Sequence, residues 1–162
     1  MHDSKKQLST ALSPLLREHG FRRRALTWHK TCTDTILVFH VEKNRWGANR
    51  YTFHLGVYIR ALGSELTPPH YRCPVQIDLD SLVPDPERLQ QASNFEDPSA
   101  NTADRLSTIV ELVASYALPW LEQHSTLRAL NALAQGDYDA LLPRVRVFRS
   151  AHDYLRGLEL NT

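Results

Sequence analysis

Two histidines and a glutamate carry the most suggestive chemistry in this chain. His40 and Glu42 lie in residues 35–43, and His54 lies in residues 50–59; apolar and polar residues alternate in both stretches. Such alternation predicts two β-strands. If His40 pairs with His54, the register also sets Val41 opposite Phe53 and Phe39 opposite Leu55, so both imidazole rings share the polar face. Imidazole can bind a metal ion or transfer protons near neutral pH, and Glu42 could orient one ring.

A metal site would need a third ligand, which His29, Asp78 or His70 could supply. The sequence does not place these residues, and it contains neither HExxH nor CxxC. The alternative is a plain polar sheet face on which histidine, threonine and tyrosine simply fit the pleat. No catalytic residue, metal ion or cofactor is therefore predicted. A metal-assisted or acid–base hydrolase centred on the two histidines and the glutamate is kept as the alternative function.

The polar face and the loop that joins the two strands also suggest a surface for a protein partner. Tryptophan, tyrosine and arginine are the residue types that most often anchor interfaces. The alternative for Trp46 is that its ring folds back on its own hairpin. The residues predicted to contact a partner are Arg45, Trp46, Glu42, His40, His54, Tyr58 and Arg60.

Basic and aromatic residues also raise the possibility of nucleic-acid binding, which is the third hypothesis. Single strands bind where cations follow the backbone and rings stack on bases. The near-neutral net charge of +1 and the dispersed acidic residues argue against this function. A run of three arginines is also typical of a solvated strand rim. The residues concerned are Arg22, Arg23, Arg24, Lys43, Arg45, Arg50 and Arg60, with Trp46, Tyr51 and Tyr58.

The composition is that of an ordinary globular protein, with 42% hydrophobic and 23% charged residues among 162. We expect residues 1–162 to form a single α+β domain. Two cysteines, Cys32 and Cys73, favour free thiols in a reducing compartment, although one bridge is geometrically conceivable. No signal peptide or membrane span is expected, so the predicted location is the cytoplasm.

The predicted fold is a four-stranded antiparallel meander with an N-terminal helix and C-terminal helices packed on one face. Strands are expected at residues 26–30, 35–43, 50–59 and 73–79, with Lys30 opposite Thr35. The first helix begins at Asp3 or Ser4 and stops at Gly20. Helices are also expected from residue 102, ended or bent by Pro119, from Ser125 to Gly136, and in a last region that includes Val145.

Several short motifs, in this order, resemble a family of uncharacterised bacterial proteins, domain of unknown function 4304. The motifs are Gly20-Phe21-Arg22-Arg23, Trp28, Val41-Glu42-Lys43-Asn44-Arg45-Trp46-Gly47, His54-Leu55-Gly56-Val57-Tyr58 and Ala117-Leu118-Pro119-Trp120-Leu121. His54 stands where the family more often has asparagine, and Glu42 where it more often has glutamine. The resemblance implies an α+β fold and carries over no reaction and no catalytic residue.

The sequence favours a non-enzymatic protein-binding domain that acts as an immunity-type inhibitor of a bacterial toxin or effector. This expectation depends on the missing catalytic motif, on the exposed hairpin and on an analogy with other small bacterial proteins. The partner would be an unidentified protein, and neither a membrane nor a nucleic acid is expected as the partner.

Overall fold

The computed structural model describes residues 3–136 and 145–159 of the chain. Within them, six strands form one antiparallel sheet in which spatial order follows chain order. The strands are β1 Arg22–Arg24, β2 Thr27–Thr31, β3 Thr35–Lys43, β4 Tyr51–Ile59, β5 Val75–Asp78 and β6 Val145–Val147. The two central strands, β3 and β4, are the longest, so they form the rigid platform of the fold.

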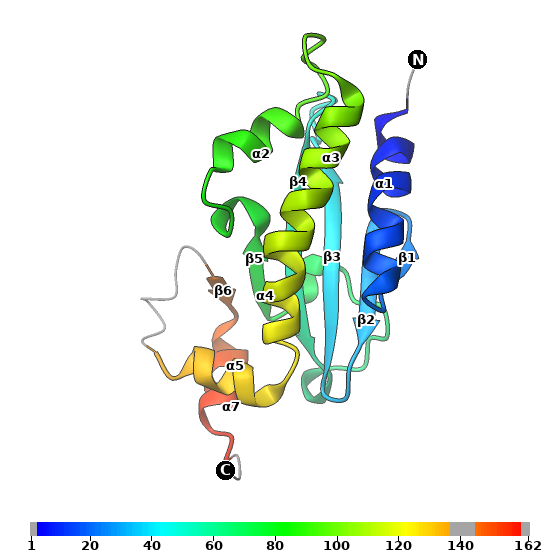
Figure 1. Ribbon diagram of the computed structural model, residues 1–162. Coiled ribbons are helices and arrows are strands. Elements are labelled where there is room, and N and C mark those ends of the chain that lie inside the picture. The colour runs from blue at the N-terminus through cyan, green and yellow to red at the C-terminus, as the bar shows by residue number, and fades with distance from the viewer. Residues whose placement is uncertain (1–2, 137–144, 160–162) are drawn as a thin grey trace.

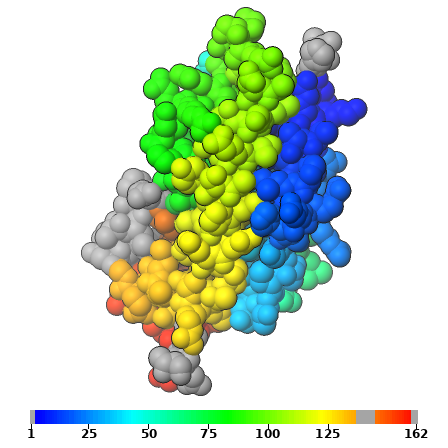
Figure 2. Space-filling view, viewed as in Figure 1, coloured from blue at the N-terminus to red at the C-terminus, as the bar shows by residue number. Residues whose placement is uncertain are grey.

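Helices cover one face of this sheet. Figure 1 shows α3 and α4 running across the sheet as one long ridge, with α1 beside them. Figure 2 shows the same ridge in space-filling form, flanked by α1 on one side and by α2 and α5 on the other. The helices are α1 Ser4–Glu18, α2 Pro86–Ala92, α3 Thr102–Leu112, α4 Leu118–Gln123, α5 Leu127–Ala134 and α7 Arg149–Arg156. Short helical turns are η1 Arg60–Leu62, η2 His70–Arg72, η3 Leu79–Ser81 and the π turn η4 Val113–Ala117.

The predicted α+β class with an antiparallel sheet is confirmed, but the predicted number of strands is wrong. The sheet of the described residues has two further strands, β1 and β6, at its edges. All three residues of β1 are exposed arginines, so no apolar alternation marks this strand. Val145 was predicted to lie in a helix, yet it begins β6, and the last described helix starts only at Arg149. Strands of three residues are too short to show a period.

The pairing of the two long strands is the predicted one: His40 pairs with His54, Val41 with Phe53 and Phe39 with Leu55. The predicted register of β2 on β3 is wrong by two residues, because Lys30 pairs with Leu37 instead of Thr35. Thr31 pairs with Ile36, and the Cys32 N–H donates to the Thr35 carbonyl, so the turn is tighter than the expected four residues 31–34. A shift of two residues leaves every side chain on its predicted face.

The inner face of the sheet carries the core. Trp28, Phe39 and Phe53 are fully buried, and their rings lie in sequence at centroid distances of 5.9 and 6.2 Å. Leu12 and Leu16 of α1 are also fully buried. Burying each such side chain contributes about 2–3 kcal/mol, which holds the sheet against its helices.

Gly20 and Pro119 were each predicted to interrupt a helix, and the two predictions have different outcomes. Gly20 ends α1 with φ 89°, and the Phe21 N–H donates to the Leu16 carbonyl, as a glycine stop requires. Pro119 was predicted to end or bend its helix; the chain does not leave the helix there, because α3 passes through the π turn η4 directly into α4, which contains Pro119 in its first turn. A π turn, in which hydrogen bonds span five residues instead of four, lies immediately before Pro119. The wider turn makes room for proline, which has no N–H to donate.

The outer face of the sheet is less open than the alternation suggests. Residues 60–74 cross part of it and bury Ile36, Val38 and Tyr58, with Cys73, in a second small apolar cluster. A side chain at Gly56 would come within 2.7 Å of Cys73, so glycine lets this segment approach the sheet. The polar outer surface is therefore confined to the end of the sheet that holds His40 and His54. No helix of the described residues is long and apolar enough to span a membrane.

Candidate functional site

Three histidine rings meet on the outer face of the sheet. The His70 ring lies 4.4 Å from that of His40 and 4.6 Å from that of His54, centroid to centroid. His40 and His54 are 6.2 Å apart, and the three ring planes lie within 26° of parallel. We call these three rings, with the carboxylates of Glu42 and Asp78, the histidine cluster.

Strand register and one short turn bring these rings together. His40 and His54 are cross-strand neighbours, so their positions are fixed by the ladder of β3 and β4. His70 comes from η2, which follows Pro69 and ends the segment that crosses the outer face. Thr27 Oγ1 lies 2.8 Å from His40 Nδ1, which leaves His40 Nε2 without a partner among the described residues. The cluster is therefore built on rigid elements.

His54 is held between two carboxylates. Its Nδ1 lies 2.7 Å from Asp78 Oδ1, and its Nε2 lies 3.0 Å from Glu42 Oε2. The Thr52 hydroxyl is also 3.0 Å from Nε2. Arg146 of β6 donates to Asp78 at 3.1 Å and holds that carboxylate from the other side. Because β3, β4 and β5 each supply one partner of His54, and β6 holds Asp78 through Arg146, the ring orientation of His54 is strongly defined.

Burial and charge set the ionisation of the three rings differently. Burial lowers the pKa of His54, but the hydrogen bond and charge of Asp78 and the nearby Glu42 outweigh burial and leave that pKa raised. Burial, reinforced by the neighbouring rings, lowers the pKa of His70 to about 4 and also lowers the pKa of His40. The His54 hydrogen bond, with Arg146, lowers the pKa of Asp78 to about 2. At neutral pH His40 and His70 are therefore neutral, with lone pairs available.

Three members of the cluster have the composition and proximity of metal ligands. One ligand atom each from Glu42, His54 and His70 fits within a mutual distance of 4.8 Å. Ligand atoms in a tetrahedral zinc site are about 3.3 Å apart, given bonds of about 2.0 Å. The 3.0 Å contact between His54 and Glu42 already has this spacing, so mainly His70 would have to move closer. Asp78 on Nδ1 of His54 is placed like the carboxylates that orient metal-binding histidines.

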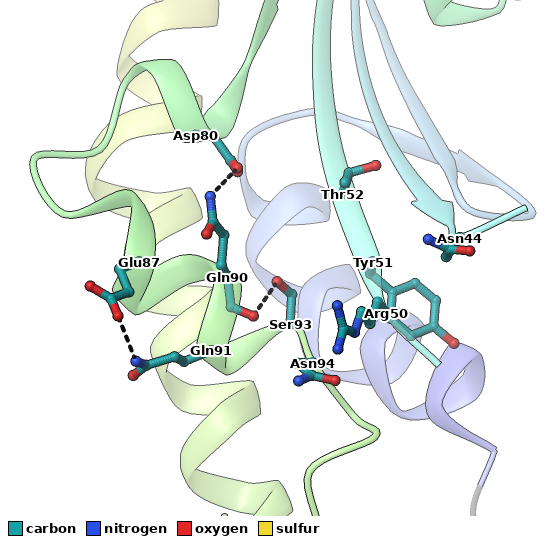
Figure 3. A pocket seen from close by; sticks show the side chains of 10 residues that line it. All are labelled: Asn44, Arg50, Tyr51, Thr52, Asp80, Glu87, Gln90, Gln91, Ser93 and Asn94. Atoms are coloured by element: carbon teal, nitrogen blue, oxygen red, sulfur yellow. Dashed lines mark hydrogen bonds between the residues drawn. The ribbon is translucent and has the colours of Figure 1, made fainter. Parts of the chain in front are cut away.

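A polar cavity adjoins the cluster at Thr52. It has a volume of about 510 Å³ and lies between α2 and the start of β4. Figure 3 shows α2 side chains, among them Gln90 and Gln91, on one side and Arg50, Tyr51 and Thr52 on the other. Because Thr52 both lines this cavity and contacts His54, a ligand there would reach the edge of the cluster.

The predicted partner-contact residues divide into three groups in the structure. His40, Glu42 and His54 come together in the histidine cluster. Arg45 and Trp46 lie at the hairpin tip between β3 and β4, where Trp46 is 87% exposed and does not fold back on the hairpin.

The other two residues have structural contacts. Tyr58 is only 7% exposed, and its hydroxyl accepts from the Glu65 N–H. Arg60 donates to the carbonyls of Cys32 and Thr33 at the turn between β2 and β3. The predicted surface is therefore not continuous.

The residues considered as a third ligand also have definite positions. His70 joins the cluster, and Asp78 orients His54. His29 does not join it, because His29 is buried and its Nε2 lies 2.8 Å from the Pro68 carbonyl. The two cysteines are free thiols, of which Cys73 is fully buried.

Sequence reasoning did not find Arg146, Thr27 or Thr52 as parts of this site. Thr52 precedes His54 by two residues and shares its polar face, so a search for polar residues two positions away would have found it. Thr27 faces His40 only in the observed register of β2. Arg146 lies 68 residues from Asp78 on a strand that the sequence pattern did not reveal, so no local signal pointed to it.

Comparison with known proteins places the chain in a family. No curated protein and no solved structure matches it. The sequence profile described as "domain of unknown function (DUF4304)" matches residues 12–123. This range covers well over half of the 162 residues and includes every member of the histidine cluster. The chain therefore belongs to the DUF4304 family.

Proposed function

We propose that this protein binds a divalent metal ion, with Zn²⁺ as the first candidate, through Glu42, His54 and His70. The observation that carries the proposal is the alignment of Asp78, His54 and Glu42, with the His70 ring stacked beside it. A purely structural histidine needs one hydrogen-bond partner for each nitrogen. Here two further neutral rings lie in contact with His54, and the His40 ring still has an unpartnered nitrogen within the described residues.

Such a site is suited to metal-assisted hydrolysis. Three protein ligands leave one coordination position for water or substrate, which is the arrangement of catalytic zinc sites. A bound metal ion supplies Lewis acidity and lowers the pKa of its water to about 7. His40, which is neutral and lies beside His70, would be placed to hold a proton at its Nε2 in such a reaction. We infer that Asp78 and Arg146 act as positioning residues because they touch only His54 and each other within the cluster.

Metal binding is tested by titrating the purified protein with Zn²⁺ in a calorimeter. We expect one equivalent to bind, and we expect His54→Gln and His70→Gln each to weaken binding by about 100-fold. His19→Gln is the matched control, since His19 lies at the end of α1 and bonds only to Leu15. Equal affinity in all three variants, or no binding to the unmodified chain, would refute the proposal.

The exposed hairpin tip favours a second candidate function, protein binding of the immunity type. Trp46 is an 87% exposed indole at the end of two long, rigid strands, and an exposed tryptophan beside arginine is a common interface anchor. We expect a partner retained from a lysate of the native host to be lost with Trp46→Ala. Leu66→Ala, which removes a side chain that is 78% exposed, serves as the control. Recovery of no stoichiometric protein would count against this function.

A further inference from the structure

A notch lies at the edge of the sheet directly beside the histidine cluster. The last residue pair between β2 and β3 is Thr27 with His40, but β3 continues to Lys43. The Val41 N–H still donates to the Leu26 carbonyl at this edge. By the alternation of a strand, the Lys43 N–H lies on the same edge, beyond the end of β2. The start of α1 lies on the remaining side, and the result is an open depression of about 680 Å³.

Four cationic side chains surround this notch. They are Lys5, Lys6, Arg23 and Lys43, and none of them forms an ion pair with another described residue. The carboxylates that share the notch have other contacts: Asp3 accepts from the first backbone N–H groups of α1, and Glu42 contacts His54. The whole chain has a net charge of only +1, so its overall composition does not explain why four cations gather here.

The notch and the histidine cluster share two residues. His40 and Glu42 line the notch, and both belong to the cluster. By strand alternation the side chains of His40 and Glu42 turn to the outer face, whereas Lys43 turns to the face covered by α1. A ligand held by the cations of the notch would therefore lie across the edge of the sheet from the proposed metal ion. The turn between β1 and β2 that forms part of the wall contains Ala25 with φ 54°, a conformation that costs an L-residue energy and is often found at ligand sites.

We propose that the notch binds the phosphoryl group of a small molecule such as a phosphate ester. This inference goes beyond the proposed metal binding and does not depend on it. Lysine and arginine side chains and an edge N–H are typical phosphate donors. The four cations line this one notch between α1 and β3. A nucleic-acid strand would need a longer row of cations.

Binding of phenyl phosphate, measured by calorimetry on the metal-free protein, tests the notch by itself. We expect Arg23→Gln with Lys43→Gln to weaken binding by at least about tenfold, because two close charges are lost. The matched control is Arg22→Gln with Lys30→Gln, which removes the same charge outside the notch and should change the affinity less than twofold. Thermal melts of both double variants verify that they fold.

Addition of Zn²⁺ separates the two proposals. We expect phenyl phosphate to bind at least about fivefold more tightly with Zn²⁺, because the metal ion neutralises Glu42, and we expect Glu42→Gln to abolish that gain. Zn²⁺ affinity of the Arg23/Lys43 variant should remain within about threefold of the original.

If the two double variants lost equal affinity for phenyl phosphate, the proposed anion site in the notch would be refuted, even if Zn²⁺ binds. Failure of Zn²⁺ to bind while the notch variants lose phosphate would overturn the metal site alone. A 12-residue oligonucleotide that binds far more tightly than phenyl phosphate, and is lost with the same variants, would refute the small-molecule ligand.

Discussion

Replacement of Asp78 by asparagine tests how strongly the orientation of the His54 ring depends on the Asp78 carboxylate. The change keeps the shape and an accepting oxygen but removes the charge from the 2.7 Å contact with His54 Nδ1. A charge-assisted hydrogen bond contributes about 1.5–3 kcal/mol and a neutral one about 0.5–1.5 kcal/mol. The Asp78 side chain is 34% exposed, so solvent screening places the loss near the lower end, at about 1 kcal/mol.

The same substitution should affect metal binding more than stability. Residues that orient a metal-binding histidine typically contribute about 10- to 100-fold in affinity. Arg146 loses its partner in this variant, but its side chain is 46% exposed and can be hydrated at little cost. We therefore expect Zn²⁺ affinity to fall by about 10- to 100-fold, with a melting temperature lower by about 3 °C.

Urea unfolding, thermal melts and Zn²⁺ calorimetry of the purified variant measure both effects. Asp80→Asn is the matched control, because Asp80 contacts Gln90 at 3.3 Å and does not touch a histidine of the cluster. An Asp78→Asn protein with unchanged Zn²⁺ affinity would refute the positioning role. Equal effects of the two substitutions would also refute it, since they would reflect net charge alone.

Three further predictions concern local features of the fold. Ala25→Gly should stabilise the protein by about 0.5–1 kcal/mol in urea unfolding, because glycine accepts the positive φ of 54° without strain; a loss of stability would contradict the assignment of strain. A thiol reagent should label Cys32 in the native protein and leave Cys73 unmodified until unfolding, because burial raises the pKa of Cys73 and excludes the reagent; labelling at equal rates would be the contrary result. Burial lowers the pKa of His29 in the folded protein, so below pH 6.5 the unfolded chain binds a proton that the folded protein does not, and the free energy of unfolding should fall as pH drops. His29→Asn should flatten this pH dependence. An identical slope in both proteins would disprove it.

The pairing of β3 with β4 could be predicted because both strands are long and strictly alternating. A slip by one residue would have turned Phe39 and Leu55 to solvent, and a buried face does not permit that. Strand alternation alone therefore predicts that His40 and His54 lie side by side on one face. The same argument could not fix the β2 register, because a shift of two residues preserves the faces and is decided by the turn.

The rest of the site depends on contacts that leave no local pattern. His70 reaches the cluster because residues 60–74 fold over the outer face, and their irregular sequence shows no period. Gly56 is the one local signal of this packing, since a glycine within a central strand often marks the close approach of another segment. Arg146 depends on the pairing of β6 with β5, which the sequence analysis interpreted as helix.

We propose that His54 and His70 bind one metal ion together with Glu42. Nitrogen-15 NMR of the histidine rings during a Zn²⁺ titration tests it most directly, because each ring nitrogen reports its own proton or metal. We predict that the Nε2 signal of His54 and one nitrogen signal of His70 shift together and saturate at one equivalent, while Nδ1 of His54 keeps its bond to Asp78 and His19 is unchanged. Ring signals of His54 and His70 that stay in place throughout the titration would contradict the account.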